Sequence, residues 1–274
     1  MHSRNDIGAL LTEHGLAPRR DLGQNFVVDA NTVRKIARLA NVGPDDHVVE
    51  IGAGLGSLTL ALAETGARIT AIEVDHGIAA VLRNVVGDLS NVTVVEADAL
   101  RIDWADLLAA SPQWTLVANL PYNVATPLVC DLLDLVPAVG RMLVMVQREV
   151  AERLCAAAGS DAYGAVSVKV AYWAIARIVA TVPASVFLPR PKVESALADI
   201  RRRPEPAVDV PPKALFDLVR TAFGQRRKML RRSLAAIVAP EVFDAAGIDA
   251  QRRPEELDVV KWGALTNAWL AAST

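Results

Sequence analysis

The chain has 274 residues, of which 52% are hydrophobic, and a formal net charge of −2 at pH 7. Its length allows one large domain, or a medium domain with a small one, and its low net charge argues against a chain that binds nucleic acid over its whole surface. The charges are nevertheless uneven: residues 1–184 contain 14 Lys and Arg against 20 Asp and Glu, whereas residues 185–274 contain 15 against 11. Ordinary variation in surface charge is one explanation. The other is a polyanion that meets only the C-terminal part.

Neither the cysteines nor the N-terminal segment indicates secretion. Cys130 and Cys155 lie in Leu- and Ala-rich patterns without metal-ligand spacing, which indicates core thiols in a reducing compartment and no metal site. The N-terminal segment lacks the apolar core of a signal peptide. An apolar stretch at 170–188 imitates a membrane span, but Arg177 and Pro183 interrupt it. The sequence therefore predicts a soluble, cytoplasmic protein that does not enter a membrane.

Apolar segments of strand length alternate with amphipathic segments of helix length along most of the chain. This alternation predicts a mostly parallel sheet with helices on both faces, an α/β fold. The expected helices are 8–16, 30–41, 58–64, 76–86, 126–136 and 148–158. The expected strands are 47–51, 68–73, 92–95, 114–118, 141–147, 166–180 and 193–201.

The Arg- and Pro-rich segment that begins at Arg201 indicates a linker, and residues 213–274 are predicted to be helical throughout. We therefore expect two domains. The first spans 1–203 and carries the sheet, and the second is a small helical domain at 204–274.

The segment 48–59, VVEIGAGLGSLT, predicts a buried strand, a tight turn and the start of a helix. Glycines at Gly52, Gly54 and Gly56 permit positive φ and let a ligand approach the backbone. The helix start adds unpaired N–H groups and a partial positive charge. This turn suits a nucleotide-like ligand, although a tight turn without a ligand is the alternative, since a glycine-rich turn alone is a weak signal.

Polar residues follow four successive strands of the predicted sheet: Glu50, Glu73, Asp98 and Asn119. The carboxyl ends of parallel strands meet at one edge, where such sheets bind ligands. Glu73 offers two oxygens to a ribose diol, and Asp98 offers an acceptor to an adenine amino group. Because Glu50 would repel a pyrophosphate but attract a sulfonium and an ammonium group, the pattern favours S-adenosylmethionine over NAD.

The motif Asn119-Leu120-Pro121-Tyr122 closes the fourth of these strands. The Asn119 side-chain oxygen and the Leu120 carbonyl could accept both N–H bonds of an exocyclic base amine, which is a poor nucleophile. Pro121 would fix the backbone, and Tyr122 would offer a face on which the base stacks. Orientation and electrostatics would then supply most of the rate. A plain Asn-x-Pro turn is the alternative.

These motifs resemble the ribosomal RNA adenine dimethyltransferase family. The resemblance rests on LGQNF (22–26), EIGAGLGSLT (50–59), EVD (73–75), DAL (98–100), NLPYN (119–123), QREVAERL (147–154), YGAVSV (163–168), VFLPRPKVES (186–195) and FGQRRKMLRRSL (223–234). It implies a class I, Rossmann-like S-adenosylmethionine-dependent methyltransferase domain followed by a small all-helical domain.

The resemblance further implies dimethylation of N6 on two adjacent adenosines in a hairpin loop near the 3′ end of small-subunit (16S) rRNA. It implies a monomer that acts on the small ribosomal subunit during biogenesis. Asn119, Leu120, Pro121 and Tyr122 would contact the target base, and Phe187 would close the base pocket, with a core phenylalanine as the alternative. The implied cofactor contacts are Asn25, Val27, Gly52, Gly54, Glu73, Asp98 and Asn119.

The segment 220–232 holds six Lys and Arg and no acid. We expect its cations to spread over one helix surface and bind RNA phosphates, with a solvated helix face as the alternative. They are Arg220, Arg226, Arg227, Lys228, Arg231 and Arg232.

Two other functions stay open at this point. One is a large-subunit (23S) rRNA adenine N6-methyltransferase of the resistance type, against which the FGQRRK segment and the long helical tail argue. The other is a non-catalytic ribosome-assembly factor, against which the intact motif at 119–122 argues.

Overall fold

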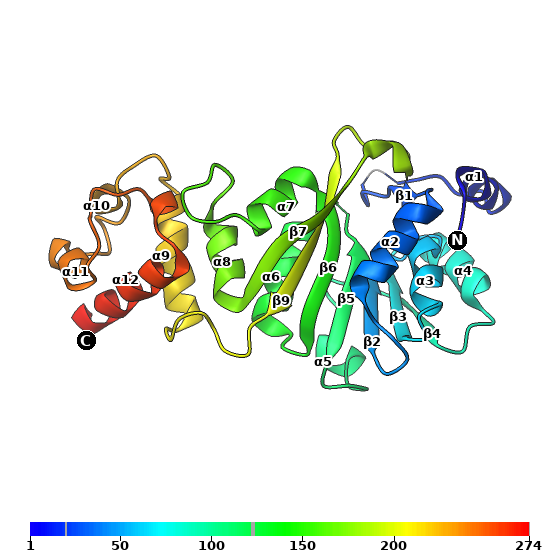
Figure 1. The fold of residues 1–274 in the computed structure, drawn as a ribbon, viewed down its shortest axis with the longest axis horizontal. Helices are drawn as coiled ribbons and strands as arrows, with labels where there is room; N and C mark the ends of the chain where they lie inside the picture. The colour runs from blue at the N-terminus through cyan, green and yellow to red at the C-terminus, as the bar shows by residue number, and fades with distance from the viewer. Residues whose placement is uncertain (20, 122–123, 274) are drawn as a thin grey trace. The chain divides into compact units, whose positions relative to one another are not determined.

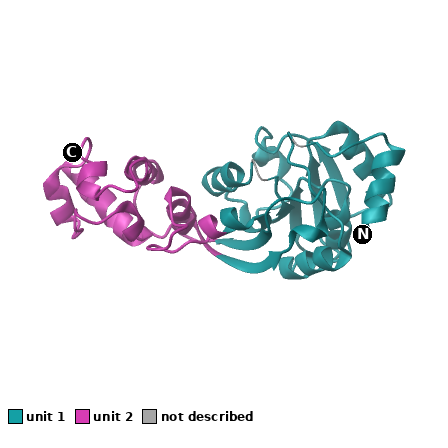
Figure 2. Ribbon diagram, turned by 90° about the horizontal axis from the view of Figure 1, so that it is seen from above, with its two compact units in different colours: residues 1–151, 177–201 teal, residues 152–176, 202–274 magenta. Residues whose placement is uncertain are grey.

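The computed structural model describes residues 1–19, 21–121 and 124–273. The chain divides into two compact units, which Figure 2 shows in different colours. Unit 1 comprises residues 1–151 and 177–201, and unit 2 comprises residues 152–176 and 202–274. The units differ from the predicted domains at 152–176 and at 202–203, which the sequence assigns to the first domain and the structure places in unit 2.

Unit 1 is built on a seven-stranded sheet with the strand order β4-β3-β2-β5-β6-β9-β7 (Figure 1). Neighbouring strands from β4 to β6 pair in parallel, and β9 runs antiparallel to β6. The predicted, mostly parallel sheet is thereby confirmed. The strands are β2 (His47–Ile51), β3 (Arg68–Glu73), β4 (Val92–Glu96), β5 (Trp114–Asn119), β6 (Val139–Gln147), β7 (Ala174–Val182) and β9 (Ser195–Arg202).

The strand order reverses between β2 and β5. From β2 the chain adds β3 and β4 on one side, and it then returns to place β5 and β6 on the other. In open sheets of this kind, the loops at the carboxyl ends of the two central strands diverge and leave a crevice for a ligand. A two-stranded antiparallel sheet of β1 (Phe26–Val27) and β8 (Phe187–Leu188) completes the strands of unit 1.

Helices cover both faces of the sheet; in the view of Figure 1, α2 lies in front and α6 behind. The Asp29 side chain caps α2 by accepting from the Thr32 N–H, and the apolar face of this helix is buried as its spacing predicts. Helices before residue 155 are α1 (Arg4–Glu13), α2 (Ala30–Ala40), α3 (Ser57–Ala63), α4 (His76–Val86), α5 (Trp104–Leu107), α6 (Ala125–Leu135) and α7 (Arg148–Leu154).

The strand predicted at 166–180 is wrong in its first half. Residues Ala165–Trp173 form helix α8, and β7 begins only at Ala174. The many valines of this segment favour a strand, but Val168 and Tyr172, four residues apart, pack together into the core of unit 2. Tertiary packing of one helical face thus outweighs the local preference for a strand.

Unit 2 has its own hydrophobic core, in which Phe243 and Trp262 are almost fully buried. Residues 213–274 are not helical throughout, because turns separate short helices, notably at 224–229. Within the described residues, no helix is both long and apolar enough to span a membrane. The helices of the C-terminal part are α9 (Pro212–Phe223), α10 (Leu230–Ser233), α11 (Pro240–Ala245) and α12 (Val259–Ala272).

Candidate active site

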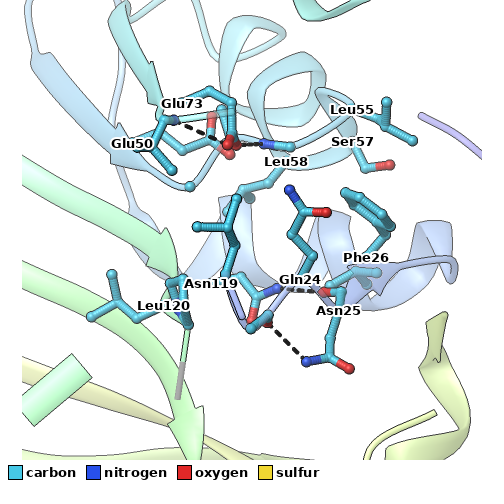
Figure 3. Close-up of a pocket in the computed structure, with 18 of the residues that line it drawn as sticks. Gln24, Asn25, Phe26, Glu50, Leu55, Ser57, Leu58, Glu73, Asn119 and Leu120 are labelled. Atoms are coloured by element: carbon cyan, nitrogen blue, oxygen red, sulfur yellow. Dashed lines mark hydrogen bonds between the residues drawn. The ribbon is translucent and has the colours of Figure 1, made fainter. Parts of the chain in front are cut away.

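Two adjoining pockets open at the carboxyl ends of the central strands in unit 1. The inner pocket, of about 780 Å³, is shown in Figure 3; the outer pocket, of about 670 Å³, shares part of its wall. The structure brings most predicted site residues together here. Asp98 lines the outer pocket, Gly52 and Pro121 line both, and the inner pocket adds Asn25, Val27, Gly54, Glu73, Asn119 and Leu120.

The glycine turn forms the floor of the inner pocket. Gly52 and Gly54 have φ of +71° and +58°, which other residues adopt at a cost. A Cβ atom on Gly54 would lie 3.2 Å from the Phe26 ring, so a larger residue would disturb the loop above it. The turn is held against the neighbouring strand β3, since the N–H groups of Gly52 and Ala53 donate to the Ile72 carbonyl at 2.9 and 3.1 Å.

Glu73 anchors the same turn at the end of β3. Its carboxylate accepts from the N–H of Gly54 at 2.9 Å and from those of Val74 and Asp75 at 3.0 Å. Burial raises the pKa of Glu73, and these three backbone donors oppose the rise. Oε1 accepts the bonds from Val74 and Asp75 and Oε2 accepts the bond from Gly54, so Oε2 keeps one lone pair for a hydroxyl of a ribose.

Glu50 lies at the end of β2 and is almost completely buried, at 1% exposure. Its Oε2 meets no hydrogen-bond donor among the described residues. Burial raises the pKa of Glu50 to about 8, and the neighbouring Glu73 charge acts in the same direction. A buried acceptor without a donor costs free energy unless a ligand supplies one.

Asn119 connects the end of β5 to the loop at 22–27. Its Nδ2 donates to the Asn25 carbonyl at 3.0 Å. Because a carbonyl only accepts, this contact fixes the amide orientation and leaves Oδ1 as the free acceptor. The next residue, Leu120, is held by its N–H, which donates to the Met145 carbonyl at 3.0 Å, and no described residue donates to its own carbonyl.

Tyr122 lies outside the described residues, so its predicted stacking role stays a prediction. Pro121 lies in the walls of both pockets. Its carbonyl accepts from the N–H groups of Val124 and Ala125 at 3.2 and 3.1 Å, which ties the motif to the start of α6. The motif is therefore anchored on both sides of the residues that would meet a base.

The outer pocket is a mostly apolar slot with two acids, Asp21 and Asp98, in its wall. Val74 and Leu100 are each 48% exposed and line it, although apolar side chains of this size are usually buried. Asp98 Oδ1 accepts from the Leu100 N–H at 2.9 Å, and Oδ2 lies 3.6 Å from Arg101 Nε. A flat apolar ring with an amino group at its edge fits this arrangement.

A family model described as Ribosomal RNA adenine dimethylase matches residues 15–269. The chain belongs to this ribosomal RNA adenine dimethylase family. It is 44% identical over 279 residues to the Ribosomal RNA small subunit methyltransferase A of Bifidobacterium adolescentis, which covers 96% of this chain and 92% of that protein.

Two crystal structures share the fold of this dimethylase. The 23S rRNA methyltransferase ErmE is 26% identical, with a TM-score of 0.71, over 89% of this chain and 98% of that one. A dimethyladenosine transferase from Plasmodium falciparum is 22% identical, with a TM-score of 0.74, over 86% of this chain and 94% of that one. The predicted Rossmann-like methyltransferase fold with C-terminal helices is therefore confirmed.

The family uses S-adenosylmethionine as its methyl donor, and the charges of the two pockets fit that cation. Glu50, Glu73, Asp21 and Asp98 are in the pocket walls, whereas no Lys, Arg or His is found among the described lining residues. Carboxyl groups in these walls suit a sulfonium and an ammonium group better than a pyrophosphate, because a bound cation favours their ionised form whereas a pyrophosphate would add a like charge. The outer pocket would take the adenine and the inner pocket the amino-acid end.

Gln24 and Ser57 also line the inner pocket, and the sequence did not single them out. The Arg19 N–H donates to Gln24 Oε1 at 2.8 Å, so the Gln24 amide nitrogen is the free end. Figure 3 shows it pointing toward the side of the pocket that carries Glu73 and Ser57. Gln24 Nε2 and Ser57 Oγ are buried without a partner among the described residues. Both are donors, which suits the carboxylate of the cofactor, while Glu50 suits its ammonium group.

Phe187 does not join the described lining of either pocket. Its side chain is fully buried in the core of unit 1, and its backbone pairs with Val27 across the β1–β8 sheet. The structure thus favours the core role for Phe187. Its backbone pairing with Val27 also holds the pocket residue Val27 in place.

The predicted RNA-binding cations do not share one helix surface. Helix α9 ends at Phe223, so Arg227 and Lys228 lie on the turn segment 224–229. Arg226 pairs with Glu255 at 2.5 Å and donates to the Asp161 carbonyl at 2.9 Å. Arg220 on α9 is paired with Asp217, and Arg231 and Arg232 are on α10.

Proposed function

We propose that the chain transfers methyl groups to N6 of two adjacent adenosines in the hairpin loop near the 3′ end of small-subunit rRNA. It would act in the cytoplasm, as a monomer, on an assembling small subunit. The choice of the small subunit is supported by 44% identity over almost the whole chain to a small-subunit methyltransferase, against 26% to the 23S enzyme.

The position of Asn119 carries this proposal. Its amide nitrogen is bound to the Asn25 carbonyl, so its side-chain oxygen faces away from that bond, and no described residue donates to this oxygen. The Leu120 carbonyl follows directly in the chain. Two acceptors next to each other match the two N–H bonds of an adenine N6 amine. The inner pocket that carries them is the one lined by Glu50 and Glu73.

The amine of adenine is a weak nucleophile because its lone pair is delocalised into the ring. When bound, S-adenosylmethionine supplies an electrophilic methyl group on a sulfonium. Asn119 and Leu120 would accept from both N–H bonds and favour the pyramidal nitrogen, which makes its lone pair available to an electrophilic methyl carbon. After transfer, the surplus proton of the nitrogen would leave to solvent. Orientation and electrostatic stabilisation of this kind accelerate methyl transfer without a strong base.

A methyl-transfer assay with labelled S-adenosylmethionine tests the proposal. The substrates are small and large ribosomal subunits from a strain that lacks the modification, and the rRNA is digested to nucleosides afterwards. We expect dimethyladenosine from small subunits and none from large ones. Label on large-subunit rRNA would favour the 23S alternative, and tight subunit binding without transfer would favour the assembly-factor alternative.

A further inference from the structure

One loop of unit 1 forms part of the wall of both pockets. Its described residues are Arg19 and 21–24, and we call it the pocket loop. Residues 22–24 line the inner pocket, and Asp21 and Leu22 line the outer one. None of the described residues of the loop belongs to a helix or a strand. The position of this wall therefore depends on individual hydrogen bonds and ion pairs.

Arg19 closes the pocket loop through its backbone. The Gln24 N–H donates to the Arg19 carbonyl at 3.1 Å, and the Arg19 N–H donates to Gln24 Oε1 at 2.8 Å. The second bond turns Gln24 Nε2 toward the inner pocket (Figure 3). Because both bonds join residues of the loop to each other, they fix its conformation but not its position beside the sheet.

The Arg19 side chain connects the pocket loop to the start of α4. Its Nη2 lies 2.6 Å from Asp21 Oδ2, within the loop, and its Nη1 lies 3.5 Å from Asp75 Oδ2. Asp75 is itself held in place, because its Oδ1 caps α4 by accepting from the Ile78 N–H at 3.1 Å, and its side chain is only 11% exposed. The guanidinium group thus links an acid of the loop to an acid of the rigid part of unit 1.

The Asp75 end of this link is next to the part of the site that Glu73 provides. The Asp75 N–H donates to Glu73 Oε1 at 3.0 Å, and Glu73 lines the inner pocket. Just beyond the other end of the loop, the Asn25 carbonyl accepts from Asn119 Nδ2 at 3.0 Å. The pocket loop is therefore attached to the end of β5 on one side and, through Arg19, to the end of β3 on the other.

We propose that Arg19 is a positioning residue of the cofactor site, which holds the pocket loop where Asp21 and Gln24 face a bound cofactor. The inference rests on the proposed function and adds to it a residue outside the described lining of both pockets. A ligand binds more weakly when the binding-competent conformation is only partly populated. The ion pair with Asp75 raises that population before the cofactor arrives, so Arg19 acts without touching the cofactor.

Calorimetric titration with S-adenosylhomocysteine tests the link in low and in high KCl. The chains compared are the unaltered one, Arg19→Gln, Asp75→Asn and the double variant. Asparagine at position 75 keeps an oxygen for the cap of α4 but loses the charge. The matched control is Arg83→Gln, which breaks an ion pair with Glu96 of 3.1 Å on the same helix, since neither residue is in the described lining of a pocket. Thermal melting checks that each variant is folded.

We expect Arg19→Gln to bind S-adenosylhomocysteine about threefold more weakly in low salt, and Arg83→Gln to bind it normally. In high salt the unaltered chain should approach Arg19→Gln, because the Arg19 side chain is 54% exposed and its ion pair is screened. Arg19→Gln should have little further effect in a chain that already carries Asp75→Asn.

Unchanged affinity in a folded Arg19→Gln variant would overturn the inference. An equal loss in Arg83→Gln would do the same, and so would a full threefold loss on top of Asp75→Asn. Binding of S-adenosylhomocysteine needs no rRNA. Failure of methyl transfer to small subunits, which would overturn the proposed function, is therefore distinguishable from failure of the Arg19 link.

Discussion

The inner pocket of unit 1 and the exposed cations of unit 2 differ in the charged side chains that they present. We call six of these cations the basic surface: Arg227, Lys228, Arg231, Arg232, Arg252 and Arg253. The pocket places Glu50 and Glu73 in its wall with no cation among the described lining residues. The basic surface presents six exposed cations, and the acids beside it are bound to local donors. One region suits a cation and the other a polyanion. A net charge of −2 over the whole chain hides both.

The difference shows that ion pairs within the protein must be taken into account before a charged side chain is assigned to a ligand. Unit 1 also contains many arginines, but Arg141 is bound to Asp199 at 2.7 Å and to the Leu39 carbonyl at 2.8 Å at the end of α2. Asp199 is also close to Arg177 and Arg201. Burial of Asp199 opposes ionisation, but the hydrogen bonds and charges of Arg141 and Arg201 outweigh it and lower its pKa. These cations are therefore already paired within unit 1.

The largest expected effect separates catalysis in the pocket from binding on the basic surface. Asn119→Ala removes an acceptor for the target amine, so we expect methyl transfer to fall by about 10²-fold or more. Subunit binding and its salt slope should stay unchanged. Single-turnover transfer and filter binding measure the two properties, with the exposed Asn84→Ala as control. A variant that still dimethylates at the normal rate would refute the assigned role.

The next effect concerns the buried acid of the pocket. Glu50 keeps its proton in the folded state up to about pH 8, whereas in the unfolded chain it ionises near 4.5. Its contribution to stability is present below pH 4.5 and is lost as the pH rises toward 8, by at most about 1.4 kcal/mol per pH unit. Glu50→Gln should abolish that loss.

Urea unfolding of both chains at pH 5, 6, 7 and 8 measures this difference. Glu64→Gln is the control, because it makes the same Glu-to-Gln change at an exposed position. Parallel stability curves for the unaltered chain and Glu50→Gln would contradict the assignment of a protonated, buried Glu50.

A smaller effect tests which end of the cofactor the inner pocket holds. Gln24→Ala removes a buried donor without a partner, and we expect S-adenosylhomocysteine to bind about tenfold more weakly. The affinity for 5′-methylthioadenosine, which lacks the amino-acid end, should not change. Calorimetry with both ligands measures this, and the exposed Gln113→Ala is the control. Equal losses for the two ligands would instead indicate that Gln24 only supports the loop.

The sequence predicts the pocket better than the basic surface, for a physical reason. Strand ends, glycine turns and the positions of Glu73 and Asn119 follow from local patterns, and a parallel sheet brings them to one edge. The orientation of the Gln24 amide depends on the hydrogen bond from the Arg19 N–H to its oxygen, and residue spacing does not reveal this contact. Arg252 and Arg253 precede acids in the sequence, and only the backbone bonds to α10 reveal them as part of a basic surface.

The smallest expected effect compares two cations that are two residues apart. Arg226 is paired with Glu255, whereas Lys228 has no ion-pair partner among the described residues. Arg226→Gln loses the ion pair with Glu255 and the bond to the Asp161 carbonyl, so we expect unit 2 to lose roughly 0.5–1 kcal/mol of stability. The pair is partly exposed, and solvent screening keeps the loss small. Lys228→Gln should change stability by less than about 0.5 kcal/mol but lower the salt slope of subunit binding by about 1. Thermal melting and filter binding of the two variants therefore give opposite patterns if pairing decides which cations bind RNA, and the same pattern if only their place in the basic segment matters.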